Sequence, residues 1–322
     1  MIENNKNIFF NLKSLNNLNI KKHKIIIITG ATGSGKSAYA VKLAQEINGV
    51  IINADSMQIY RQIPILSAQP AITERAGVQH YLYGFCDIFD TKTNYSVGRY
   101  LLDLKRIVEI IMNSEKNIIP IIVGGTMLYI DAIVNGLNVM PEIPIEVKSA
   151  IRKQYADFTT EELYNELLKI DDVYAKIIDK NNPQRILRGI EVKVATGKSL
   201  SEFWAKRRCL LTFDNNEYAL QKLIITLPRE ILYDRINKRF DKMIGGGALE
   251  EARTIYDYCH RNEFLFCNLP KAIGLHNFFD YFNKKISLDY AIELSKQESR
   301  NYAKRQLTWF RNRFSDFTQI EL

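Results

Sequence analysis

The segment from Lys24 to Ser37, KIIIITGATGSGKS, limits the fold of this chain more than any other stretch. It begins with the isoleucines of Ile25 to Ile28, and such a β-branched apolar run is typical of a strand buried on both faces in a parallel sheet. Apolar residues then recur at helical spacing from Ala38 to Ile47. A strand, a glycine-rich turn and a helix in this order indicate a phosphate-binding loop.

The pattern G-x-x-x-x-G-K-[ST] gives each part of this loop a physical task. Glycines let backbone N–H groups close around an anion, and the helix N-terminus adds partial positive charge. Lys36 offers a mobile charge to outer phosphate oxygens, and the Ser37 hydroxyl can ligate Mg²⁺. The alternative, a turn without a ligand, is disfavoured because the motif is complete. We expect a pyrophosphate-type group at Gly30, Ala31, Thr32, Gly33, Ser34, Gly35, Lys36 and Ser37.

Composition narrows the class of protein. The 322 residues suffice for one large domain with an insertion. The net charge of +8 fits a polyanionic partner, although an Asn/Ile-rich, lysine-rich composition also arises without one. No C-x-x-C or paired histidine spacing indicates a zinc site or a disulfide framework, and no run approaches a membrane span. We expect a cytoplasmic protein whose residues 1–23 form a loosely ordered extension.

Two further buried strands end next to polar residues. The strand expected at Val50–Asn53 precedes Asp55, and the strand at Ile118–Val123 ends in Gly124-Gly125-Thr126. Because parallel strands present their carboxyl ends to the ligand crevice, Asp55 would point toward the phosphate loop. Two alternatives stay open: Asp55 caps a following helix, and the Gly-Gly pair either makes a tight turn or lets a substrate approach the backbone.

After residue 141 the spacing of apolar residues is helical up to residue 208. Residues 145–208 show no convincing strand, whereas a strand at Gln221–Thr226 and a helix at Arg229–Met243 follow. We expect an α/β fold, a P-loop NTPase-like parallel sheet flanked by helices, with an all-helical insertion domain. The core would comprise residues 24–140 and 209–322, and the insertion residues 141–208.

Two basic helices have roles that the residues alone leave open. Arg185 and Arg188 share a face of the helix that Pro183 opens, and this face is either solvated or recognises phosphates. The helix expected at Leu288–Arg313 interleaves Lys and Arg with aromatic residues. That composition fits nucleic-acid binding and a packed amphipathic helix equally well.

Several blocks together resemble the tRNA dimethylallyltransferases (isopentenyltransferases). They are GATGSGKS, then NADSMQIY at 53–60, VGGTMLY at 123–129, NPQRILR at 182–188 and KRQLTWFR at 304–311. They occur in the family's order and span residues 25 to 313. The phosphate loop alone is shared with many kinases, whereas the Asp55, GGT and KRQLTWFR blocks are jointly specific.

The resemblance implies transfer of a dimethylallyl group from dimethylallyl diphosphate to N6 of adenosine 37, 3′ of the anticodon, in tRNAs reading codons that begin with U. Asp55 would take the proton of the amine, and Thr126 would hydrogen-bond near the reacting centre. Lys36, the loop amides and a Mg²⁺ on Ser37 would neutralise the diphosphate. Arg239 would add a further clamp on the phosphates, with Arg235 as the alternative.

The resemblance also implies an RNA surface, since the adenine must be extruded from its stack. Its residues would be Asp55, Ser56, Met57, Gln58, Thr126, Lys148, Gln184, Arg185, Ile186, Leu187, Arg188, Lys271, Ala272, Ile273, Gly274, Leu275 and His276. The partners would be the tRNA anticodon stem-loop and dimethylallyl diphosphate, with Mg²⁺ as cofactor, no membrane and a monomeric enzyme.

This chain departs from the family's usual pattern at several positions. A glycine and a lysine are replaced by Leu66 and Gln69, a tyrosine and a cation by Leu275 and His276, and an acid by Gly84. We expect these changes to affect tRNA contacts more than the chemistry.

Two other functions compete with prenyl transfer. A small-molecule or nucleoside kinase would use Arg185 and Arg188 as lid arginines. A non-catalytic RNA-binding module would leave the complete phosphate loop without a task.

Overall fold

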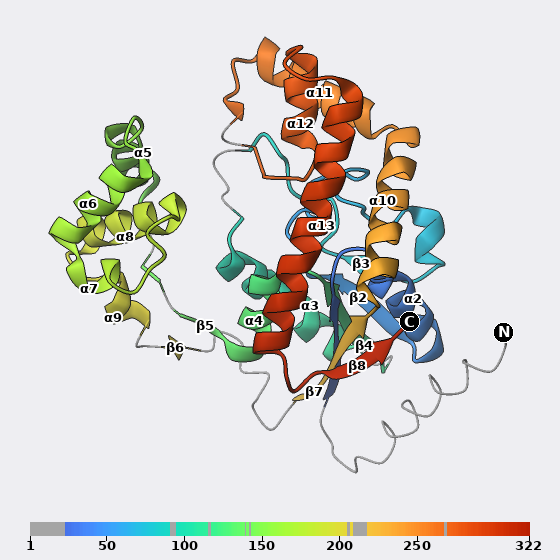
Figure 1. Cartoon of the computed structure of the whole chain (residues 1–322). Coiled ribbons are helices and arrows are strands. Elements are labelled where there is room, and N and C mark those ends of the chain that lie inside the picture. Colours follow the sequence, from blue (N-terminus) through green and yellow to red (C-terminus); the bar gives the residue numbers. More distant parts are fainter. Residues whose placement is uncertain are drawn as a thin grey trace. The chain divides into compact units, whose positions relative to one another are not determined.

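The computed structural model describes residues 23–90, 95–114, 117–138, 140–141, 143–204, 207–208, 218–266 and 269–322. The chain divides into two compact units (Figure 1). The core unit comprises Met1–Val134 and Phe213–Leu322, and the helical unit comprises Asn135–Thr212. The expected N-terminal extension lies outside the described residues except for His23, as do Cys209 and Cys267.

A parallel sheet forms the centre of the core unit, with strand order β3-β2-β4-β1-β7-β8. Its strands are β1 His23–Gly30, β2 Gly49–Asn53, β3 His80–Tyr81, β4 Ile119–Gly124, β7 Tyr218–Thr226 and β8 Thr318–Glu321. Every neighbouring pair runs parallel. The isoleucines of β1, Ile25 to Ile28, are at most 2% exposed. Burial on both faces is what a central parallel strand requires, and the expected α/β fold is confirmed.

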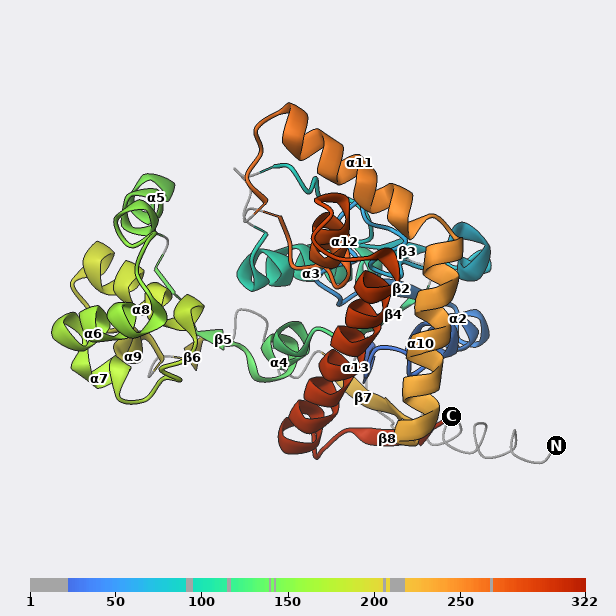
Figure 2. The ribbon, with the colours of Figure 1, turned by 45° about the horizontal axis from the view of Figure 1, so that its top comes forward.

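Long helices flank this sheet. They are α2 Lys36–Glu46, α3 Val97–Met112, α4 Met127–Asn135, α10 Arg229–Gly245 and α13 Leu288–Arg313. Helix α2 packs Val41 and Leu43 against the sheet face that carries Ile26 and Ile28. Helices α10 and α13 lie side by side, as Figure 2 shows. The sequence predicted the bounds of α13 correctly.

A second apolar cluster in the core unit joins α11 Ala248–Arg261 and α12 Leu275–Phe282 to the chain between β2 and α3. That connection also contains the short helix η3 Ile72–Arg75. Cys259 is 2% exposed within the cluster and is a packing residue there.

The helical unit contains α5 Ile145–Gln154, α6 Thr160–Ile170, α7 Asp172–Ala175, α8 Pro183–Thr196 and α9 Leu200–Trp204. Its apolar core includes Leu167, Tyr174 and Ile186. Gly189 on α8 makes room for this packing, because a Cβ there would lie 2.5 Å from the Tyr174 ring.

Short strands are where the sequence-based expectations were wrong. β5 Leu137–Asn138 pairs with β6 Arg207–Arg208, although no strand was expected in residues 145–208. β3 and β8 were not foreseen either. Two-residue strands are too short to show a period of two, and β8 is largely exposed at the sheet edge, so neither carries the apolar signal of a buried strand.

Candidate active site

The carboxyl ends of β1, β2 and β4 bring three polar segments to one edge of the sheet. In register, Thr29 lies beside Gly124 and Asn53 beside Val123. The Thr29 hydroxyl donates to the Gly124 carbonyl at 3.0 Å. The phosphate loop, the segment after β2 and the GGT segment after β4 therefore start from adjacent strand ends, as expected for a parallel sheet.

Gly124 permits an unusually close approach of two backbones. A Cβ at this position would lie 2.1 Å from the carbonyl carbon and oxygen of Ala54. The backbone N–H of Thr126 donates to that same carbonyl at 3.2 Å. Gly125 instead faces the phosphate loop, because a Cβ added at this position would lie 3.5 Å from Lys36 Nζ. The Gly-Gly pair thus joins two strand ends and borders the phosphate loop.

Asp55 lies in a tight turn that its own side chain supports. Its backbone N–H donates to Asn53 Oδ1 at 2.8 Å, and its Oδ1 accepts from the N–H of Met57 at 3.0 Å. No helix begins in residues 54–71, so the helix-capping alternative does not apply. The neighbouring Ser56 is bound to Thr126, and Thr126 follows the Gly125 that borders Lys36, so the turn at Asp55 lies close to the phosphate loop. The Asp55 charge acts on both Lys36 and Arg239.

Thr126 connects the GGT segment to the turn at Asp55. Its hydroxyl accepts a hydrogen bond from the Ser56 N–H at 2.8 Å and donates to Ser56 Oγ at 3.2 Å. Asp55 and Thr126, which the sequence places far apart, are therefore held in one hydrogen-bonded arrangement.

Two cationic side chains, Lys36 and Arg239, lie at the phosphate loop together with buried polar atoms that have no hydrogen-bond partner among the described residues. Burial lowers the pKa of Lys36 to about 8, the negative charge of Asp55 opposes this effect, and Arg239 adds to it. Arg239 Nη2 donates to the hydroxyl of Thr32 at 2.6 Å. Its Nε and the Oγ of Ser34 are buried and have no hydrogen-bond partner among the described residues. Two cations and unsatisfied donors fit an anion with several oxygens.

Arg235 lies on the outer side of this arrangement. Its Nη1 would be 3.5 Å from a Cβ at Gly35, but its side chain is exposed. Arg239 is partly buried and has a buried, unpaired Nε, so it is the better placed of the two candidates for holding a phosphate.

Helix α13 contributes residues that the sequence analysis did not assign to the site. Gln306 is 1% exposed, and its side chain accepts from the Thr32 N–H at 2.8 Å and donates to the Gly125 carbonyl at 2.7 Å. Tyr302 hydrogen-bonds with Thr126 and Gln306, and burial raises its pKa, as does the charge of Asp55. The sequence did offer one signal for Gln306: its polar amide lies on the same helix face as the apolar Ala303 and Phe310, which are buried.

Comparison with known proteins decides the family. The chain matches the family model described as IPP transferase over residues 58–313 and that of isopentenyl transferase over residues 23–88. A tRNA dimethylallyltransferase of Bartonella henselae is 41% identical over 299 residues, which cover 92% of this chain and 98% of that protein. This chain belongs to the IPP transferase family. The resemblance drawn from the sequence blocks is confirmed.

Solved structures resemble this IPP transferase in fold as well. The tRNA isopentenylpyrophosphate transferase of Bacillus halodurans has a TM-score of 0.64 at 32% identity, covering 93% of this chain and 90% of its own. A eukaryotic dimethylallyltransferase acting on tRNA has a TM-score of 0.76 at 29% identity, covering 93% of this chain and 74% of its own. Within the described part of this chain, no helix has the length and apolarity to cross a membrane.

The expected RNA-contacting residues of the core unit differ in accessibility. The side-chain amide of Gln58 donates hydrogen bonds to the carbonyls of Ser67 and Ala68. Of the segment at 271–276, Lys271 and His276 are exposed and Ile273 is partly exposed, whereas Ala272, Gly274 and Leu275 are buried. Contacts of this segment with RNA would therefore fall mainly on its exposed members.

Four of the five positions that the sequence resemblance marks as departures from the family pattern form two local groups. Leu66 and Leu275 are both buried in the cluster of α11 and α12. Gln69 donates to the Tyr60 carbonyl at 2.7 Å, and its Oε1 would be 3.2 Å from a Cβ at Gly84. The substitutions at each group therefore lie close together.

In the helical unit, the buried Glu191 organises basic side chains of two helices. Glu191 is 2% exposed; its Oε1 accepts from Arg152 of α5 at 3.0 Å and its Oε2 from Arg188 of α8 at 3.4 Å. Gln184 and Arg185 are exposed, Leu187 and Lys148 are partly exposed, and Ile186 is buried in the core of the unit. Arg152 was not singled out from the sequence, because only the fold brings it to Arg188.

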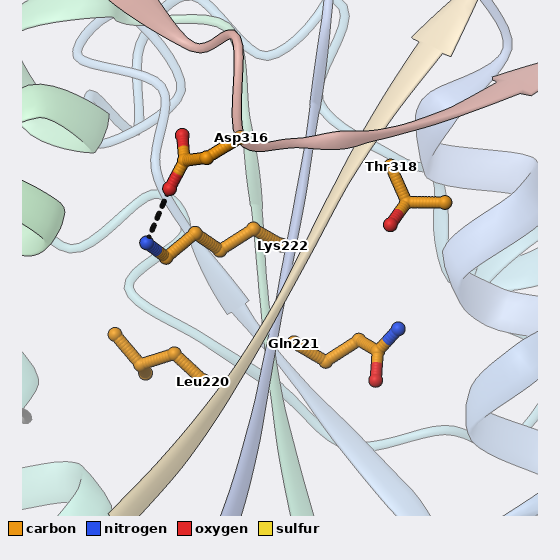
Figure 3. Close-up of a pocket in the computed structure, with 5 residues that line it drawn as sticks. All are labelled: Leu220, Gln221, Lys222, Asp316 and Thr318. Atoms are coloured by element: carbon orange, nitrogen blue, oxygen red, sulfur yellow. Dashed lines mark hydrogen bonds and ion pairs between the residues drawn. The ribbon is translucent and has the colours of Figure 1, made fainter. Parts of the chain in front are cut away.

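A shallow hollow of about 260 Å³ lies elsewhere on the core unit (Figure 3). Its lining consists of Leu220, Gln221, Lys222, Asp316 and Thr318, and Lys222 pairs with Asp316 at 2.7 Å. Gln221 pairs in register with Ile26, well before the carboxyl end of β1. The hollow is therefore separate from the candidate active site.

Proposed function

We propose that this IPP transferase moves a dimethylallyl group from dimethylallyl diphosphate to N6 of adenosine 37 in tRNAs that read codons beginning with U. The observation that carries the proposal is the meeting of the phosphate loop with Asp55, Thr126 and Arg239 at one sheet edge. Relatives named tRNA dimethylallyltransferase over nearly the whole chain favour this function over the kinase alternative.

The donor diphosphate would lie on the phosphate loop. Lys36 and Arg239 would receive the charge that develops as the bond from carbon to the diphosphate oxygen breaks. The unpaired Nε of Arg239 and Oγ of Ser34 would gain partners from phosphate oxygens. These interactions strengthen as the leaving group forms, which is the condition for accelerating the step.

A Mg²⁺ ion fits the donor set at this loop. The Ser37 hydroxyl follows Lys36 at the start of α2, and Mg²⁺ is commonly held by few protein oxygens together with substrate phosphates. When bound, the ion would neutralise part of the diphosphate charge.

The acceptor amine would react beside Asp55. Its nitrogen lone pair forms the new bond to the first carbon of the dimethylallyl group, and the electrons of the broken bond leave with the diphosphate. The surplus proton on N6 passes to the Asp55 carboxylate, while the Thr126 hydroxyl holds the base. The adenine has to leave its stack to reach this position.

We further propose that the RNA surface comprises the exposed residues at 55–58 and 271–276 and the basic side chains at 148 and 184–188. We also propose a monomeric, cytoplasmic enzyme. The free thiols of Cys86 and Cys259 fit a reducing compartment, and the net charge suits a polyanionic substrate.

Donor use tests the proposal. The purified protein is given dimethylallyl diphosphate and Mg²⁺ with an anticodon stem-loop that carries adenosine 37, and nucleosides are measured by mass spectrometry. We expect dimethylallylated adenosine, and none when guanosine replaces that adenosine. Phosphorylation of a nucleoside by ATP without prenylated RNA would instead identify a kinase.

A further inference from the structure

We infer that Gln306 is a positioning residue that sets the spacing between the donor-phosphate loop and the segment that holds the acceptor base. The inference rests on the proposed function and assigns a role to the KRQLTWFR block. One side chain makes both contacts: Oε1 accepts from the Thr32 N–H at 2.8 Å, and Nε2 donates to the Gly125 carbonyl at 2.7 Å.

The two contacts are made to main-chain groups in a buried place. Gln306 is 1% exposed, and a Cβ at Gly125 would lie 2.5 Å from its Nε2. Leaving a buried backbone donor or acceptor without a partner is costly, so both loops are bound to this amide. An apolar residue of similar size would fill the space but would release both loops.

Helix α13 is itself fixed relative to the site. Arg300 donates to Asn237 at 2.6 Å and Lys296 pairs with Asp241 at 2.7 Å, and both partners lie on α10. The same α10 carries Arg239, whose guanidinium holds the Thr32 hydroxyl. Thr32 is therefore held through its backbone by α13 and through its side chain by α10. These pairs give the basic helix a structural role on this face.

The consequence concerns the geometry of reaction more than binding. Donor phosphates contact the loop that contains Thr32, whereas the base is held from the segment that contains Gly125 and Thr126. If the spacing between them relaxes, each substrate still binds, but the amine and the reacting carbon no longer align. A displacement of about 1 Å can reduce a rate by about 10²-fold.

The test compares Gln306→Met, Gln306→Glu and the parent enzyme in single-turnover transfer. Gln306→Met removes both hydrogen bonds at similar volume. Gln306→Glu keeps the acceptor for Thr32 and places an oxygen against the Gly125 carbonyl. We expect transfer rates about 10²-fold below the parent, with dissociation constants for dimethylallyl diphosphate and stem-loop RNA changed less than about fivefold. The exposed Thr308→Ala on the same helix is the matched control and should behave as the parent.

Hydrogen exchange of the unliganded proteins gives a second readout that does not depend on prenyl transfer. In Gln306→Met the amides of residues 30–37 and 124–130 should exchange faster than in the parent, and in Gln306→Glu those of residues 124–130 should, while the amides of β7 stay protected in both. Unchanged exchange at both segments, an unchanged transfer rate, or a loss of rate matched by equal losses of donor and RNA affinity would overturn the inference. A parent protein that never transfers the group would reject the proposed function, and exchange would still decide the role of Gln306.

Discussion

Replacing Lys36 with methionine should stabilise the unliganded protein while it destroys donor binding. The ammonium group of Lys36 donates to the Ala31 carbonyl at 3.4 Å, and burial lowers its pKa from 10.5 to about 8. Since one pKa unit corresponds to about 1.4 kcal/mol, the charged form costs the folded state roughly 3 kcal/mol at neutral pH. The side chain keeps some exposure, so this value is an upper bound.

The sign of the pH dependence follows from proton linkage. Between pH 8 and 10.5 the unfolded chain binds a proton at Lys36 that the folded chain has released. The unfolding free energy contributed by this group therefore rises with pH across that window. Lys36→Met lacks the group. The excess of its unfolding free energy over that of the parent should therefore be largest at pH 7 and should vanish as the pH approaches 10.5.

Urea unfolding of the core unit measures this difference. In a Trp204→Phe background, Trp309 on α13 is the remaining tryptophan and reports on the core unit. Lys42→Met, at an exposed site on the same helix as Lys36, is the control and should shift the free energy by less than about 0.5 kcal/mol. The reasoning would be refuted if Lys36→Met had a lower unfolding free energy than the parent at pH 7. It would also be refuted if the difference between the two proteins did not change between pH 7 and 10.

Other substitutions test separate parts of the account. Arg239→Gln should raise the dissociation constant for dimethylallyl diphosphate more than tenfold in calorimetry, whereas the exposed Arg235→Gln should change it less than about threefold; equal effects would contradict the assignment. Gly124→Ala should lower stability by about 1–3 kcal/mol in chemical unfolding and abolish transfer, because its methyl group meets the Ala54 carbonyl; normal activity would refute the close packing. Glu191→Gln makes the protein more positive, yet should weaken stem-loop binding severalfold in anisotropy titrations because its arginines lose their position; tighter binding would show that net charge dominates.

The pH profile of donor use offers a further check on Lys36. In the free enzyme the protonated ammonium is the form that attracts diphosphate, and its pKa is about 8. The value of kcat/KM for dimethylallyl diphosphate should therefore fall as the pH rises above about 8, while Lys36→Met should show no such fall at its much lower level. A flat profile in the parent up to pH 10 would contradict the assignment.

Much of the core unit could be predicted because its signals are local. The isoleucines of β1, the loop motif and the strands that end at Asp55 and Thr126 each carry a pattern, and the parallel topology places their ends together. Gln306 could not be placed in the same way, because its partners Thr32 and Gly125 are distant in sequence. Only the packing of α13 against the sheet of the core unit brings Gln306 into contact with these two residues.

The helical unit illustrates the same limit. Pro183 predicts where α8 begins, and the structure adds an Asn182 cap that accepts from the Arg185 N–H at 3.2 Å. The pairing of Arg152 with Glu191 depends on how α5 and α8 pack, which no periodicity specifies. Short strands such as β8 were missed because an exposed edge strand lacks an apolar pattern.

The role of Asp55 at a shared crevice is the central claim, and single-turnover transfer by Asp55→Ala tests it most directly. Donor and RNA are presented at saturating concentrations, and dimethylallylated adenosine is quantified over time in rapid-quench samples beside a calorimetric measurement of donor affinity. The account predicts a rate about 10²–10⁴-fold below the parent with a donor dissociation constant changed less than about threefold. A transfer rate equal to that of the parent would contradict it.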